Sequence, residues 1–119
     1  MEEQRESMGR IEVAPEVLAT IAQYAVRRVD GFSQMAAIPP HIASMFRRAT
    51  RQDGIVLDIV DNRARFDIYV IMEPQVNALE ASREMQTAVT EAIDTLVGIP
   101  VDTVNVHVED VTYAQGEVI

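Results

Sequence analysis

Residues 76–97 form the longest stretch of this sequence in which apolar side chains recur at the period of an α-helix. Asn77 offers a side-chain oxygen to the first free backbone N–H groups, and Glu80 follows three residues later as in a capping signal. Gly98 and Pro100 end the stretch. The pattern predicts a long helix with one apolar face, which needs a broad apolar surface beneath it. The predicted apolar stripe is Val76, Leu79, Met85, Val89, Ala92, Ile93 and Leu96.

Two alternating stretches, 55–60 and 64–72, predict the strands that supply this surface. The Asp-Asn pair at 61–62 tolerates the positive φ of a tight hairpin turn. With that pair as the loop, Asp58 faces Arg65, while the other face of the hairpin is apolar. We expect helices to cover that apolar face, which consists of Ile55, Leu57, Ile59, Phe66, Ile68 and Val70.

Shorter patterns complete the chain. Residues 10–13 alternate and predict a short strand, and a helix is expected from Pro15 to a stop signal at Gly31. Residues 41–51 carry a narrow apolar stripe with arginines on the far side, which predicts a short amphipathic helix. Residues 101–113 alternate again and predict a last strand.

The second hairpin strand, the long helix and the last strand follow one another with short loops, which is the sequence form of a right-handed βαβ crossover. We therefore predict an α+β fold, a two-layer sandwich in which helices pack on one face of a mixed β-sheet. The length of 119 residues suits one domain. We assign that domain to residues 9–113, with flexible tails at 1–8 and 114–119.

Composition narrows the possible chemistry and compartment. The chain has no cysteine, which rules out disulfides, thiolate metal sites and a cysteine nucleophile, and fits a reducing compartment. No apolar run approaches the about 20 residues of a spanning helix, and the acidic start is unlike a signal peptide. We expect a cytoplasmic protein.

Charge is distributed unevenly along the chain. A net charge of −9 argues against general binding to nucleic-acid phosphates. Residues 27–52 nevertheless hold five arginines and one acid, a local balance of +4. Within this segment Arg47, Arg48 and Arg51 are candidates for weak contact with an anionic surface such as a membrane. The alternative is that the apolar residues of 41–51 cover the edge of the core and the arginines are solvated or pair with acids.

The sequence contains no recognisable catalytic or cofactor motif. The serines lack a Gly-x-Ser-x-Gly context, the glycines form no phosphate-binding loop, and the acids and histidines lack metal-ligand spacing. His107 is the one residue that an enzyme hypothesis can use, because it should project from the open sheet face near Asn105 and Glu109, with Asp67 and Tyr69 across the sheet. We predict no catalytic, cofactor-binding or metal-binding residue, with a surface histidine as the preferred interpretation.

The sheet face away from the helices carries apolar residues among polar ones, and the sequence offers no obvious third layer to cover it. Such mixed faces commonly serve as interfaces. We therefore predict self-association into a homo-oligomer through this face. The candidate interface residues are Val56, Tyr69, Ile71, His107 and Val111.

Six short stretches, in order and spacing, resemble the bacterial alkaline shock protein family, also called Gls-type general stress proteins. They are GRIEV at 9–13, PEVLATIA at 15–22, AVRRVDGF at 25–32, DIYVI at 67–71, MQTAV at 85–89 and VNVHV at 104–108. The sequence departs from the family pattern at 35–54, where Pro39, Pro40 and the arginines replace a glycine-containing connection.

The resemblance implies a non-enzymatic cytoplasmic protein of the cell-envelope stress response, one that self-associates and in some members is held at the membrane by a separate anchor protein. It supplies no cofactor and no catalytic residue. The alternative from another class is a small KH-like nucleic-acid-binding module. The absence of a Gly-x-x-Gly loop and an aromatic content of 5% argue against it. A small enzyme using His107 is the third interpretation.

Overall fold

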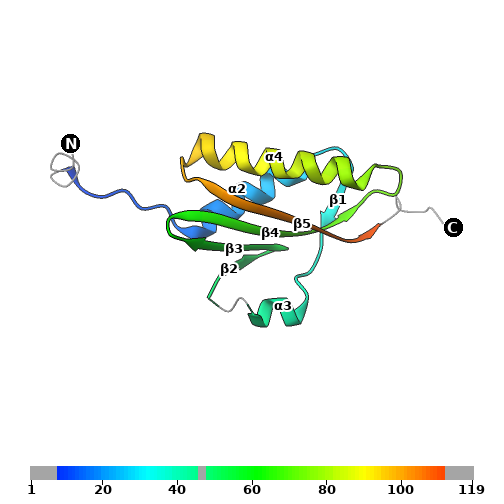
Figure 1. The fold of residues 1–119 in the computed structure, drawn as a ribbon, viewed down its shortest axis with the longest axis horizontal. Helices are drawn as coiled ribbons and strands as arrows, with labels where there is room; N and C mark the ends of the chain where they lie inside the picture. Colours follow the sequence, from blue (N-terminus) through cyan, green and yellow to red (C-terminus); the bar gives the residue numbers. More distant parts are fainter. Residues whose placement is uncertain (1–7, 46–47, 112–119) are drawn as a thin grey trace.

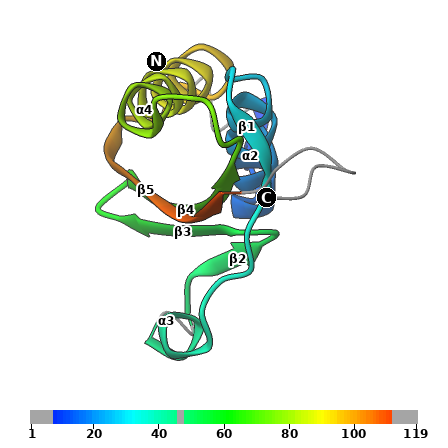
Figure 2. The same ribbon diagram turned by 90° about the vertical axis from the view of Figure 1, so that its right-hand side faces the viewer.

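The structure is a computed structural model that describes residues 8–45 and 48–111. An open five-stranded sheet carries two helices on one face, and a short third helix stands off the opposite face (Figure 1, Figure 2). This arrangement confirms the predicted two-layer α+β class. The elements are α2 (Pro15–Arg27), β1 (Phe32–Met35), α3 (Pro40–Met45), β2 (Thr50–Gln52), β3 (Ile55–Val60), β4 (Arg63–Met72), α4 (Ala78–Leu96) and β5 (Val101–Val111). The tails predicted at 1–8 and 114–119 lie outside the described residues, apart from Met8.

Strand β4 is the centre of the sheet because it is paired along both sides. β5 runs parallel to it on one side, while β3 and β1 follow one another along its other side, both antiparallel. β2 continues the sheet from β3. The predicted hairpin register is confirmed, with Asp58 opposite Arg65. Asp61 and Asn62 turn the chain with φ of 52° and 62°.

The βαβ crossover is also confirmed. β4, α4 and β5 follow one another in the chain, and the two strands are parallel neighbours. Asn77 caps α4 as predicted, since its Oδ1 accepts a hydrogen bond of 3.0 Å from the backbone N–H of Glu80. Helix α4 therefore begins and ends within two residues of the predicted stretch.

The main core lies between the sheet and the two long helices. The row that α4 buries is spaced by four residues, so Leu79 and Leu96 of the predicted stripe fall off it and are 61% and 68% exposed. Burial of each large apolar side chain contributes about 1.5–3 kcal/mol to the free energy of unfolding. The fully buried members with the largest side chains include Leu18, Val26, Ile55, Leu57, Phe66, Ile68, Val70, Met72, Met85, Val89 and Ile93.

Two predicted elements are wrong. Residues 10–13 are extended but form no strand, because they lie beside no other strand in the described chain. The helix predicted at 41–51 is only Pro40–Met45, because residues 50–52 pair with β3 as strand β2 instead. The apolar pattern of a short segment did not distinguish one continuous helix from a six-residue helix followed by an edge strand.

Residues 36–45 and 48–49 form an excursion between β1 and β2 on the sheet face opposite α2 and α4 (Figure 2). Its side chains Ile38, Ile42 and Ala49 pack with Ala36 against Val56 and Tyr69 of the sheet. A second, smaller apolar cluster therefore exists below the sheet. The expectation that nothing covers this face is wrong for the part that the excursion reaches.

Gly54 lies where the excursion, β3 and β4 meet. Its φ is +80°, and its carbonyl oxygen accepts a hydrogen bond of 2.8 Å from Tyr69 N–H. The carbonyl oxygen of Tyr69 in turn accepts one of 2.9 Å from Ala36 N–H. A Cβ on Gly54 would lie 2.7 Å from the Ala36 oxygen and 2.9 Å from the Tyr69 oxygen. Only glycine fits both the backbone angle and the space.

We predict that Gly54→Ala lowers the free energy of unfolding more than Gly98→Ala does. Gly98 has a similar φ of +82° but nothing within 4 Å of its virtual Cβ, so alanine there costs only the backbone strain, about 1–2 kcal/mol. Alanine at Gly54 adds the clash with two carbonyl oxygens, for a total of about 3 kcal/mol or more. Urea unfolding of the two variants measures the difference. Equal losses would contradict the assigned contact.

Candidate interaction surface

His107 lies on the open sheet face in a small polar cluster. Its Nε2 is 2.9 Å from Asp67 Oδ1, and its ring stacks on that of Tyr69 with centroids 4.4 Å apart. Asn105 Nδ2 donates to the same Asp67 oxygen at 3.2 Å. The strand register explains the cluster, since Asp67 is beside Asn105 and Tyr69 is beside His107. Of the predicted neighbours of His107, Asn105, Asp67 and Tyr69 are therefore confirmed.

The cluster is arranged to hold side chains in place. His107 and Asp67 are each partly exposed, and both ring and carboxylate are engaged within the sheet. No group of three His, Cys, Asp or Glu side chains able to hold a metal ion occurs among residues 8–45 and 48–111. The arrangement therefore presents a ring, an amide and a carboxylate as a fixed polar surface.

Burial raises the pKa of the Tyr69 phenol above its ordinary value of 10.0, and the nearby carboxylates of Asp67 and Glu109 raise it further. The folded protein thus holds the phenolic proton more tightly than the unfolded chain does. By linkage, the corresponding stability is present below about pH 10 and is lost as the pH rises through the folded-state pKa.

The five candidate interface residues do not form one exposed surface, because they differ in burial and in the sheet face on which they lie. Val56 and Tyr69 are 1% and 3% exposed because apolar side chains of the excursion and the His107 ring cover them. Ile71 and His107 remain partly exposed on the open face. Val56 and Tyr69 are thus core residues of the small cluster.

Val111 lies on the other side of the sheet from its predicted place. A register shift between Val108 and Asp110 leaves Glu109 as an extra residue in β5. Asp110 is therefore beside Ile71, and Val111 is beside Met72, which faces the helices. Simple alternation cannot reveal such a β-bulge, which exchanges the faces of all residues after it.

The three candidate arginines do not form one surface. Arg51 lies on β2 and its Nη1 donates a hydrogen bond of 2.6 Å to the carbonyl oxygen of Ala43, where it ties α3 to the strand. Arg48 is exposed, and Arg47 lies outside the described residues. Contact with an anionic surface stays a prediction. Of the three arginines named for it, Arg51 already donates a hydrogen bond within the fold.

Among residues 8–45 and 48–111, no strand pairs with the outer side of β5, which is therefore a free edge of the described sheet. The sequence patterns did not reveal this edge. Ala64 N–H donates to Pro100 O at 2.9 Å, so Ala64 turns its backbone toward β5, and by alternation Phe66 does the same. In a parallel ladder such a residue bonds to the two neighbours of its partner, and the partner of Phe66 is Val104. The backbone groups of Val104 therefore point away from β4.

The same alternation directs the backbone N–H and C=O groups of Val106 and Val108 to the free side. The outward carbonyl oxygen of Val104 already has a partner within the fold, because Gln86 Nε2 of α4 donates a hydrogen bond of 3.0 Å to it. The edge has no proline, lysine or arginine from Val101 to Val111, and residues 103–108 are free of formal charge. Natural sheets usually protect long edges with such residues, so this edge is suited to pairing.

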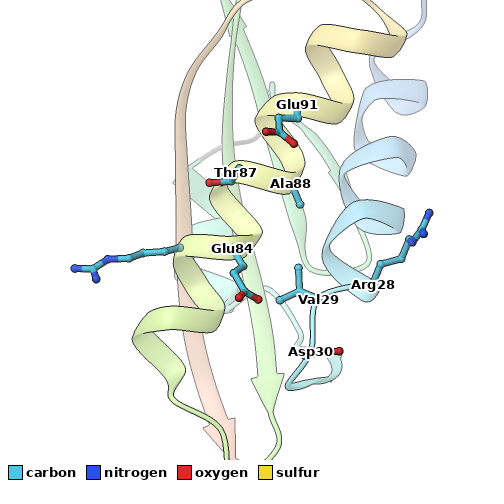
Figure 3. Close-up of a pocket in the computed structure, with 8 residues that line it drawn as sticks. Arg28, Val29, Asp30, Glu84, Thr87, Ala88 and Glu91 are labelled. Carbon is cyan, nitrogen blue, oxygen red and sulfur yellow. The ribbon is translucent and has the colours of Figure 1, made fainter.

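A seam between α2 and α4 forms a shallow groove on the helix face. Two adjoining hollows of about 650 and 510 Å³ share Arg28, Ala88 and Glu91. In the smaller one, Glu84 and Ala88 point toward Val29 while Arg28 points away (Figure 3). The groove is lined by α2 and α4, whereas His107 stacks on Tyr69 of the small cluster on the other face of the sheet, so the two do not form one site.

The fold is a small α+β domain with a free sheet edge and a fixed polar face among the described residues. Among the described residues, no helix is both long and apolar enough to cross a membrane. The model of the alkaline shock protein 23 family, described as having a cell envelope-related function, matches residues 3–113. The chain belongs to this family, and the resemblance seen in its sequence is confirmed.

Several relatives align over most of their length. The chain is 21% identical over 114 residues to the uncharacterized protein YqhY of Bacillus subtilis, covering 95% of this chain and 84% of the relative. It is 28% identical over 106 residues to the uncharacterized protein Spy1614 of Streptococcus pyogenes, covering 87% and 88%. It is 26% identical over 112 residues to the uncharacterized protein YloU of Bacillus subtilis, covering 92% and 93%. No solved structure matches the chain.

We predict that Tyr69→Phe flattens the alkaline loss of stability. In the natural protein the free energy of unfolding falls above about pH 10 in part because the buried phenol must ionise. Phenylalanine keeps the ring stack and removes that ionisation. Urea unfolding between about pH 8 and 11 measures both slopes, with Tyr24→Phe, an exposed tyrosine, as the control. A slope unchanged by Tyr69→Phe would contradict the assignment.

Proposed function

We propose that this protein is a non-catalytic interaction protein that serves its cell envelope-related function by associating with copies of itself and with other proteins. The family supplies the envelope-related role. The observation that supports self-association is the free edge of β5, where the outward groups of Val106 and Val108 have no partner within the described fold and no proline, lysine or arginine lies between Val101 and Val111.

Surface chemistry supports the same proposal. Val108 is 37% exposed beside the free edge, so a strand added there would cover an apolar side chain as well as backbone groups. Ile71 and His107 lie next to this edge on the open face and remain candidate contacts. His107 is held by Asp67 and Tyr69, which favours a fixed contact surface over a proton-transfer role.

We place the protein in the cytoplasm, at the membrane only through a partner such as an anchor protein. The nucleic-acid alternative gains no support from the open face, where Asp58 and Asp67 lie beside Arg65 and would repel phosphates.

We predict that the protein forms assemblies whose mass falls toward that of the monomer on dilution, and that Val108→Lys shifts this equilibrium toward monomer. A lysine at the centre of a free edge is a common natural block to strand pairing. Val60→Lys is the matched control, because Val60 is similarly exposed but ends a strand paired within the hairpin. Gel filtration with light scattering measures both.

A natural protein that stays monomeric at every concentration would overturn self-association. Equal weakening by Val60→Lys and Val108→Lys would show that added charge alone, rather than the edge of β5, controls the assembly.

A further inference from the structure

Two parts of the described chain are incomplete as they stand. Residues 9–14, which we call the N-terminal arm, are extended but pair with no strand, and Ile11 is 94% exposed. The arm already alternates like a strand, since Arg10 Nη2 and Glu12 Oε1 meet at 2.8 Å on one side of it. The free edge of β5 is the second incomplete part. An unpaired extended segment and an unpaired edge are complementary in hydrogen bonding.

We propose that the N-terminal arm of one copy adds as an antiparallel strand to the free edge of β5 in a second copy. This inference rests on the proposed self-association and names its contact. The proposal follows from a register in which Ile11 lies opposite Val108 and Val13 lies opposite Val106. Both valines turn their backbone groups outward, so each pair would exchange backbone hydrogen bonds.

Side chains in this register match on both faces. Ile11 and Val13 fall on the helix side of the sheet, where they extend the apolar row of Val106 and Val108. Arg10 and Glu12 fall on the open face. Glu12 then lies opposite His107.

Side chains of opposite charge also meet at the end of the pairing where Arg10 lies. Arg10 meets the bulge formed at Glu109, and the next residue, Asp110, is also acidic. The guanidinium of Arg10 therefore lies opposite a carboxylate whether Glu109 or Asp110 is its partner. The pairing is thus complementary in charge as well as in shape.

The register also explains where the pairing ends. One step past Val13 and Ala14, Pro15 would lie opposite Val104. Proline has no N–H to donate, and the Val104 carbonyl oxygen is already bonded to Gln86. The chain then enters α2 at Pro15. Both partners therefore stop pairing at the same position.

The arm cannot reach its own β5. Helix α2 packs over β1, β2 and β3, on the side of the sheet away from β5 (Figure 2). Val13 is two residues before Pro15, a reach of about 7 Å. β3 and β5 are two strand spacings apart, about 10 Å, with β4 between them. In Figure 1 the arm leaves the molecule beyond the hairpin. The acceptor is therefore a second copy.

Because arm and edge are different surfaces, each copy can donate once and accept once. Such a heterologous contact closes into a ring or a reciprocal pair, or continues as a chain of copies. A single link orders only one short arm and buries two large apolar side chains. In a reciprocal pair or ring, two or more links act together and strengthen one another.

Disulfide trapping tests the contact directly, because the natural chain has no cysteine. Ile11→Cys and Val108→Cys are made as separate proteins, mixed and oxidised. In the proposed register their Cα atoms are about 5.5 Å apart, within the range a disulfide spans. We expect a covalent dimer of the two variants. The control mixture pairs Val108→Cys with Leu79→Cys, an exposed position on α4, and should link much more slowly.

Equal linking in the control mixture overturns the proposal. Linking of Val108→Cys mainly to itself overturns it as well, since two β5 edges would then meet. Association of the natural protein that is unchanged when residues 1–13 are deleted overturns the arm and leaves self-association standing. A monomeric natural protein overturns both.

A charge exchange tests the register independently. We expect Arg10→Glu to weaken association about three- to tenfold, and Glu109→Arg added in the same chain to restore it. Arg48→Glu changes the net charge equally at an exposed position outside the contact and should have less effect. Sedimentation equilibrium gives the dissociation constants. Failure of the double variant to recover, while both single variants remain folded, overturns the pairing of Arg10 with Glu109.

Discussion

The pairing of β4 on both sides is the interaction on which the rest of the structure depends. Its helix-facing residues build the core under α2 and α4, and its backbone joins β5, β3 and β1 into one sheet. The change of neighbour from β3 to β1 occurs beside Tyr69, whose N–H and C=O bond Gly54 and Ala36. That junction starts the excursion that covers Tyr69 from below. A single strand thus sets the main core, the small cluster and the position of His107.

The elements closest to β4 were predictable because local patterns and pairing agree there. The hairpin turn has residues that tolerate positive φ, and a one-residue slip of its register would place apolar residues opposite charged ones. The cap at Asn77 lies where the apolar period of α4 begins. The His107 cluster followed from the same alternation, through the pairing of Tyr69 with His107. In each case several signals in a short stretch specify one arrangement.

The rest depends on contacts between distant segments. The bulge at Glu109 moves Val111 to the helix side, and nothing in the local alternation marks it. Val56 looked available on the open face because its cover, Ile38 and Ile42, comes from a segment with a different local pattern. The strand predicted at 10–13 has the right alternation but no partner within the described fold. Sequence patterning describes what a segment can pair with, whereas the partner is set by topology.

Membership of the alkaline shock protein family gives the chain an envelope-related role, and we propose that it meets other chains through the free edge of β5. The described fold leaves a long edge, uncharged over residues 103–108, at one side, while the other side ends in the short strands β1 and β2 of four and three residues. Association through an edge adds strands without disturbing the core. It therefore allows assembly and disassembly of folded copies.

Amide hydrogen exchange followed by NMR across a dilution series tests this account most directly. The N–H groups of Asn105 and His107 point to β4 and should be protected at every concentration. The N–H groups of Val106 and Val108 should exchange rapidly in the dilute monomer and become protected as copies associate. Protection of all four amides in the dilute monomer, or rapid exchange at Val106 and Val108 in the assembly, would contradict a free edge that pairs between copies.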